Sequence, residues 1–187
     1  MTEKRKAMRR RDRKITDRSE IDDIIHQCRV CRLGLTDGVE PYVVPLSFGY
    51  DGRALYFHCA KEGRKLDILR KNSRVCFEFD ILDGLVTGDA ACQWGMAYRS
   101  VIGAGLGRII EEPDEKRQAL TILMKQYANA EFTFPDAAVD SVAVIQVDIT
   151  SISGKQRLLP EKSIHPFPPV DTGDISNLNG KISFIQP

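Results

Sequence analysis

The pattern of apolar and polar positions predicts a helix near the N-terminus. Asp17 is followed three residues later by Glu20, the arrangement of a capping box that opens a helix. Apolar residues then recur at the spacing of one helical face: Ile21, Ile24, Ile25 and Cys28. We therefore expect an α-helix that begins at Asp17 and buries this face.

From residue 30 the pattern changes to short apolar runs separated by turns such as Asp37-Gly38 and Asp51-Gly52. The predicted strands cover 30–35, 42–50, 54–59, 74–80 and 142–152, with two more in 91–110 around a break at Trp94–Met96. Helical spacing returns in 63–71 and 114–127. Pro45 lacks an amide proton, so its point in the strand should be an edge, a bulge or a place where something else approaches. Hairpin turns, few helices and about six strands predict a mainly β fold with flanking helices, an antiparallel barrel.

Charge and composition together divide the chain into a central body and two terminal arms. Residues 1–14 carry a net charge of +6, whereas the other 173 residues carry −5. Residues 154–187 are rich in proline and glycine and have few apolar residues together, so we expect an extended C-terminal arm. One domain over 15–153 should lie between them. The basic arm could bind nucleic acid phosphates, but a solvated arm, or one folded onto a partner subunit, is the favoured interpretation.

The chain shows no apolar run long enough to cross a bilayer, and no apolar stretch follows the N-terminal charges. Its five cysteines are odd in number and irregularly placed, which is typical of reduced thiols in a cytoplasmic protein. Cys28 and Cys31 have the spacing of a metal or redox pair but no second pair follows, and the three histidines lie far apart in sequence. We expect no metal site and no membrane association.

The segment from Pro41 to Lys71 carries the most chemistry. Its basic residues gather where a loop meets the predicted helix, at Lys61, Arg64 and Lys65. A helix start offers free amide protons, and cationic side chains there add charge-assisted donors for a phosphate. The same residues could instead be a solvated charge run.

Three further features allow two interpretations each. His58 is either an ordinary strand histidine or a group that exchanges protons near neutral pH. Trp94 belongs either to a core or to the face of a planar ligand ring. The alternating glycines at 103, 105 and 107 lack the spacing of a dinucleotide loop, so they indicate strand curvature or close backbone approach.

Taken together, several segments resemble the FMN-binding split barrels related to pyridoxamine 5′-phosphate oxidase, and among these the nitroimidazole-resistance subgroup. The matching segments are MRRRDR (8–13), CRLGL (31–35), PYVVPLSFGY (41–50), LYFH (55–58), EGRK (62–65), VCFE (75–78) and YRSVIG (98–103). The resemblance covers residues 8–153. No counterpart of the oxidase's C-terminal Trp and Arg is found, which disfavours oxidation of pyridoxamine phosphate itself. The expected fold is a six-stranded antiparallel split β-barrel.

The resemblance also implies a site. FMN, or FAD in its place, would lie in a cleft at the interface of a homodimer. The expected cofactor-binding residues are Val43, Val44, Pro45 and Leu46 along the ring and ribityl chain, Phe57 and His58 beside the flavin, Arg64 and Lys65 at the phosphate, Trp94 capping the ring, and Ser100 directed toward the flavin. His58 is the candidate for substrate contact or proton delivery.

The function implied is that of a flavin-dependent reductase, which takes electrons from a reduced carrier such as NAD(P)H and passes them to a small acceptor such as a nitroaromatic. The alternative is a binding module that holds a flavin or another cofactor without turnover.

Overall fold

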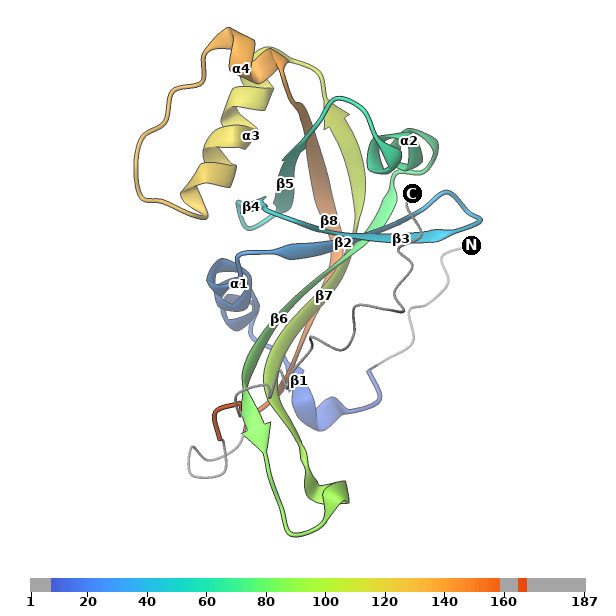
Figure 1. Cartoon of the computed structure of the whole chain (residues 1–187), viewed down its shortest axis with the longest axis vertical. Coiled ribbons are helices and arrows are strands. Elements are labelled where there is room, and N and C mark those ends of the chain that lie inside the picture. The colour runs from blue at the N-terminus through green and yellow to red at the C-terminus, as the bar shows by residue number, and fades with distance from the viewer. Residues whose placement is uncertain (1–7, 159–164, 168–187) are drawn as a thin grey trace, which may run out of the picture.

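One curved antiparallel sheet organises the part of the chain that the computed structural model describes, residues 8–158 and 165–167 (Figure 1). Its strands are β1 (Lys14–Ile15), β2 (Cys31–Thr36), β3 (Pro41–Leu46), β4 (Gly49–Tyr50), β5 (Ala54–Cys59), β6 (Arg74–Val86), β7 (Gly95–Ile110) and β8 (Ala143–Arg157). They pair in the order β3-β2-β6-β7-β8-β5-β4, and β1 joins β8. The predicted fold class is confirmed: a mainly β, antiparallel architecture with flanking helices.

The two ends of this sheet are consecutive in the sequence. Only Ser47 and Phe48 separate β3 from β4, so the sheet curls until its edge strands meet, yet no backbone ladder joins them. Phe48 is fully buried at this junction, and its amide donates to the Tyr127 hydroxyl over 2.8 Å. The barrel is therefore split at the β3–β4 junction and held together there by side chains.

The number of strands was predicted wrongly, because the described residues form eight strands where six were expected. The run 42–50 divides into β3 and β4 at the buried Phe48. The run 91–110 holds a single strand, because its first residues form a 3-10 turn (η2, Ala91–Gln93) in place of the expected strand, and Gly95 and Met96 of the expected break already belong to β7. Strand β6 continues six residues beyond the predicted end, through a bulge between Leu82 and Gly84.

The helices cover the sheet on several sides. They are α1 (Arg18–Gln27), α2 (Arg64–Lys71), α3 (Pro113–Lys125) and α4 (Asp136–Asp140), with a 3-10 turn, η1, at Arg11–Arg13. The predicted opening of α1 is confirmed, because the Asp17 carboxylate accepts from the Ser19 amide over 2.9 Å. None of the helices in these residues is long and apolar enough to cross a membrane.

The core fills the barrel interior from alternate positions of the long strands. Phe77 and Phe79 of β6, Val101 of β7 and Phe57 of β5 are all essentially inaccessible to solvent. On β7 the inward glycines make room for this packing: a Cβ at Gly103 would lie 2.0 Å from the Phe77 ring. The predicted role of these glycines, close approach within a strand, is thus confirmed.

Part of each expected arm is paired to the barrel. Lys14, the last residue of the basic arm, lies opposite Lys155 in the β1–β8 ladder. Strand β8 continues to Arg157, so the first four residues of the expected C-terminal arm belong to the sheet. His165 forms an isolated bridge with Leu85 of β6. Residues 1–7, and most of 159–187, lie outside the described residues.

A substitution at Gly49 tests the close contact between β4 and α3. A Cβ at this position would lie 2.5 Å from the backbone of Leu123, and backbone cannot move aside as a flexible side chain can. We expect Gly49→Ala to lower the free energy of unfolding by about 2–3 kcal/mol in denaturant titrations. Ser47→Ala, at an exposed position two residues away, is the control and should change it little. Equal stabilities of the two variants would contradict this account of the contact.

Candidate functional site

The edge strand β3 forms one wall of an apolar groove. Val43 and Pro45 project outward from it, and Val43 keeps 64% of its surface exposed. Pro45 indeed lies on an edge, because β3 pairs only with β2. The adjoining groove encloses about 330 Å³. Its lining residues come from β2, β3 and β6: Gly34, Leu35, Thr36, Pro41, Tyr42, Val43, Arg74, Val75 and Cys76. A planar apolar ring could lie against this wall.

The start of α2 brings a cation to the same groove. The Arg64 guanidinium lies 4.9 Å from the centre of the Tyr42 ring, and Tyr42 lines the groove. Arg64 also forms a 2.7 Å ion pair with Glu40 on the β2–β3 turn. Gly63, with a φ of 132°, precedes the helix in a conformation that suits glycine. The first amides of α2 have no intrahelical partner, so this helix start offers donors for an anion.

Phe57 and His58 point to opposite sides of β5, as successive strand residues must. Phe57 is fully buried in the barrel core, so its side chain reaches no ligand outside the barrel. His58 is exposed near the end of the strand. Burial raises the pKa of the neighbouring Cys59 thiol, while the charge of Lys65 acts in the opposite direction. Lys65 therefore acts on the Cys59 side of β5, whereas His58 faces the other side of the strand.

Val44 and Leu46 occupy the other face of β3. Both are half-buried and pack against the barrel core. Of the four β3 residues expected at the flavin, only Val43 and Pro45 thus present side chains outward, and the other two could contribute only backbone.

Trp94 and Ser100 lie at the far end of the molecule from the helix start. The register places Ser100 opposite Lys155, whereas His58 is aligned through Val144 with Ile110. Ten residues of β7 separate these rows, about 33 Å of strand. Trp94 lies between η2 and the start of β7, and the hairpin that joins β6 to β7 is at the bottom of Figure 1, while α2 is at the upper right. One protomer therefore does not bring Trp94 and Ser100 to His58, although the row of Val43 meets β7 at Ala104, four residues from Ser100.

Sequence reasoning missed the partners of the predicted cations. Glu40 and Tyr42 both contact Arg64, and no spacing rule links residues 24 and 22 positions apart. It also missed a cluster of basic residues near Ser100, formed by Lys14 and Lys155 with Arg13, Arg157 and the Tyr98 hydroxyl. The basic arm was recognised, but its contact with β8 joins residues about 140 positions apart.

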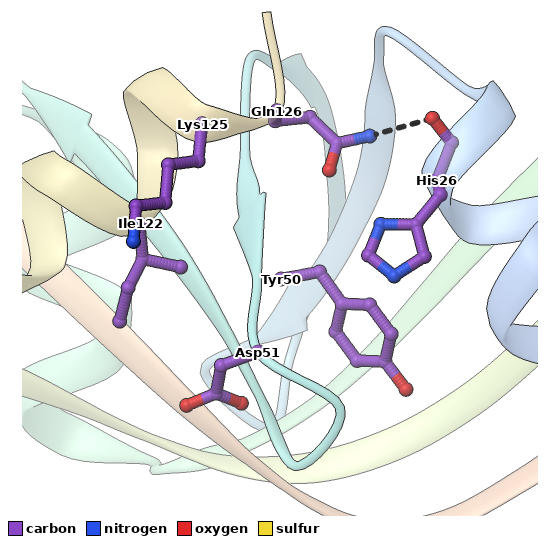
Figure 2. Close-up of a pocket in the computed structure, with 6 residues that line it drawn as sticks. All are labelled: His26, Tyr50, Asp51, Ile122, Lys125 and Gln126. Atoms are coloured by element: carbon purple, nitrogen blue, oxygen red, sulfur yellow. Dashed lines mark hydrogen bonds between the residues drawn. The ribbon is translucent and has the colours of Figure 1, made fainter. Parts of the chain in front are cut away.

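A second cavity, of about 340 Å³, lies between the C-terminal ends of α1 and α3 (Figure 2). The Gln126 amide donates to the His26 carbonyl over 3.1 Å, which ties the two helix ends together. The Tyr50 hydroxyl donates to Asp22 and accepts from Arg18, and burial, followed by the Asp22 contact, raises its pKa to about 12. The cavity therefore lies at a packing junction between α1, β4 and α3, and most of its polar groups form hydrogen bonds that stabilise this junction.

The outward face of the sheet beside the groove carries uncovered apolar side chains. Cross-strand register aligns Val43, Gly34, Cys76 and Ala104 across four strands. Ile102 and Leu106 flank this row on β7, and 48% and 46% of their surfaces are exposed. Exposed apolar area of this kind is more common on surfaces that bind another molecule than on the rest of a protein surface.

The comparisons with known proteins agree with this architecture. The pyridoxamine 5′-phosphate oxidase family matches residues 17–156. The solved structure of a putative 5-nitroimidazole antibiotic resistance protein from Bacteroides thetaiotaomicron is 37% identical, with a TM-score of 0.68 over 76% of this chain and 85% of that one. A search of curated proteins gave no match.

Two more distant structures share the fold. A flavocytochrome from Azotobacter vinelandii has a TM-score of 0.72 at 22% identity, covering 84% of this chain and 77% of its own. An FAD and heme binding protein from Mycobacterium smegmatis has a TM-score of 0.71 at 20% identity, covering 91% and 81%. The family match over most of the barrel and the shared sheet together mean that this chain belongs to the pyridoxamine 5′-phosphate oxidase-like family of flavin-binding split barrels.

Proposed function

We propose that this protein is a flavin-dependent reductase of small acceptors such as nitroaromatics, and that it binds FMN along β3. The observation that carries the proposal is the apolar groove of about 330 Å³, together with Arg64 at the start of α2, which lies over the ring of the groove residue Tyr42. A flavin needs this combination, a dry wall for its ring system and cationic donors for its phosphate. The relative named as a 5-nitroimidazole resistance protein supports the choice of acceptor.

The residues of the groove have separate tasks in this proposal. Val43 and Pro45 face the ring and keep water from one side of it. Arg64 and Lys65, with the free amides of α2, hold the phosphate. In this structure Arg64 forms an ion pair with Glu40. Binding of the phosphate would replace the Arg64–Glu40 ion pair with one between Arg64 and the phosphate. When bound, the flavin supplies the hydride and electron transfer, and the protein supplies its position.

His58 is the proposed proton donor to the acceptor. Its imidazole is exposed at the end of β5, six residues before Arg64. Reduction of a nitro group consumes protons as well as electrons, and an imidazole exchanges protons readily near neutral pH. Phe57 has no part through its side chain, which is buried on the other side of the strand.

The proposed assembly is a homodimer with the flavin at its interface. Ser100 lies ten residues along β7 from the row of His58, and Trp94 lies farther still, so in this proposal a second copy brings that end of the sheet to the flavin. The outward face that carries Val43, Ile102 and Leu106 connects the two regions. If two copies meet through this face in opposite directions, the Ser100 end of one lies over the groove of the other.

Removal of the phosphate-binding charges should release the cofactor. We expect the purified protein to show a flavin spectrum, with FMN identified by mass after release. The double variant Arg64→Ala, Lys65→Ala should bind FMN at least about a hundredfold more weakly in fluorescence titrations, because two charge-assisted contacts are lost. Arg70→Ala with Lys71→Ala removes two charges from the other end of α2 and is the matched control. Undiminished FMN binding by the first variant would refute the phosphate site.

Loss of the proposed proton donor should separate turnover from binding. We expect His58→Ala to keep the flavin spectrum while nitroimidazole reduction with NADPH falls about a hundredfold. His26→Ala changes the exposed histidine of the cavity in Figure 2 and should leave the rate unchanged. A His58→Ala rate equal to wild type would remove His58 from the mechanism. Bound flavin without turnover in the wild-type protein would identify a flavin-binding protein that is not a reductase.

A charge on the outward face should separate the subunits. We expect Ile102→Asp to be monomeric in sedimentation experiments and to lose flavin as it dissociates, since a buried unpaired carboxylate is costly. Val39→Asp, at a position that is 88% exposed in the β2–β3 turn, serves as the control. A dimeric Ile102→Asp variant would show that this face is not the interface.

A further inference from the structure

Four cations meet where the N-terminal segment joins the barrel. Lys14 and Lys155 lie directly opposite each other in the β1–β8 ladder. Arg157 follows two residues later on β8, in register with Tyr98. Arg13 precedes β1 and interacts with the Tyr98 hydroxyl. We call these five residues the Lys155 cluster.

The described residues provide almost no negative charge to this cluster. Asp12 is the nearest acid to Arg13, at 4.0 Å, but both of its oxygens already accept from Arg10, over 2.9 and 2.6 Å. On β6, the strand next to β7, Glu78 and Asp80 share Arg32, and Asp83 pairs with Arg99. In the described part of the chain, Lys14, Lys155 and Arg157 form no ion pair.

Such an arrangement costs stability, because like charges directly opposite in a sheet repel each other. The pKa of the Tyr98 hydroxyl shows the effect of the same positive charges. Burial raises its pKa, but hydrogen bonds from Arg13 and Lys155 outweigh burial and lower the pKa below its usual value. The Lys155 ammonium also lies 5.8 Å from the centre of the Tyr98 ring. The cluster thus favours an anion more strongly than any single surface lysine would.

An exposed aromatic residue adjoins these charges along the chain. The Arg157 guanidinium rests against Gly95, where a Cβ would be only 2.1 Å from its Nη1 atom. Trp94 is the next residue, and 52% of its surface is exposed. Its indole N–H donates to the Gly88 carbonyl over 2.8 Å, which fixes the ring on the hairpin between β6 and β7. Cations for a diphosphate and a fixed ring for a base therefore occur together.

We propose that the Lys155 cluster binds the diphosphate of an adenosine diphosphate group, with Trp94 beside it to stack on the base. Cationic donors suit phosphate oxygens, and tryptophan stacks on any nucleobase. Two molecules could carry this group to the site: FAD, through its adenylate half, or a pyridine dinucleotide that delivers electrons. Ser100 adjoins Lys155 and is the residue expected at the flavin. The position of this site beside the flavin therefore rests on the proposed function, whereas binding of the diphosphate does not.

The test is calorimetric titration of ADP into the full-length protein, with any bound flavin first exchanged for FMN, at low ionic strength. We expect wild type to bind ADP, and Lys155→Gln to bind it about tenfold more weakly through loss of one charge-assisted contact. Lys125→Gln removes an exposed lysine from the cavity in Figure 2 and is the matched control. Without ADP, Lys155→Gln should melt no lower than wild type, because it relieves the repulsion from Lys14.

The outcomes are separable. Absence of ADP binding, or equal affinity in wild type and Lys155→Gln, would overturn the inference while leaving FMN binding intact. ADP binding by a protein that takes up no flavin would support it and refute the proposed function.

Two further measurements identify the source of the group. Tighter binding of FAD than FMN, lost in Lys155→Gln, would indicate the adenylate half of FAD. A raised KM for NADPH with an unchanged ratio of FAD to FMN affinity would indicate the dinucleotide.

Discussion

The antiparallel ladder of β6, β7 and β8 is the interaction on which the rest of the structure depends. It runs through 12 paired positions between β6 and β7 and 13 between β7 and β8. Strict alternation along it directs Phe77, Phe79 and Val101 into the core and leaves Ile102 and Leu106 outside. The inward glycines of β7 allow this packing, since a side chain at Gly103 would occupy the space of the Phe77 ring. The same register therefore determines both the core and the uncovered apolar face.

The ladder also explains why the barrel is split and why the candidate groove lies where it does. The sheet must end at β3 on one side and β4 on the other, and only the buried Phe48 and its neighbours bridge them. An edge strand exposes backbone groups that would otherwise recruit another chain. Pro45 removes one such donor, and the β2–β3 turn, held to α2 by Glu40 and Arg64, encloses part of the edge. A ligand that covers this edge resolves a problem inherent in the fold.

Local sequence signals predicted much of the fold because they report local energies. The face of α1, the cap at Asp17, the edge position of Pro45 and the role of the β7 glycines all follow from short-range rules. The errors arose where long-range contacts decide the outcome. Residues 153–157 lack an apolar alternation, yet they extend β8 because β7 and β1 offer them backbone partners.

In the candidate site, too, the features that depend on local sequence could be predicted and those that depend on long-range contacts could not. Arg64 and Lys65 at a helix start could be recognised from composition, and the exposure of His58 agrees with a role outside the core. The burial of Phe57 follows from its phase on β5, which depends on the register with β8 and is invisible in one sequence. Glu40 and Tyr42 reach Arg64 only after the β2–β3 turn folds against α2.

The distribution of charge connects assembly with chemistry. A protein under selection for stability alone would not place Lys14 against Lys155 in a ladder, with Arg157 nearby and no acid among the described residues to balance them. Similarly, it would not leave Ile102 and Leu106 uncovered on a sheet face. Each feature is unfavourable in an isolated protomer, and each becomes favourable when a second molecule is present, an anion for the cations and another subunit for the apolar face. Because Ser100 lies between them on β7, both partners would meet at the same end of the sheet, so that cofactor binding and subunit association would strengthen each other.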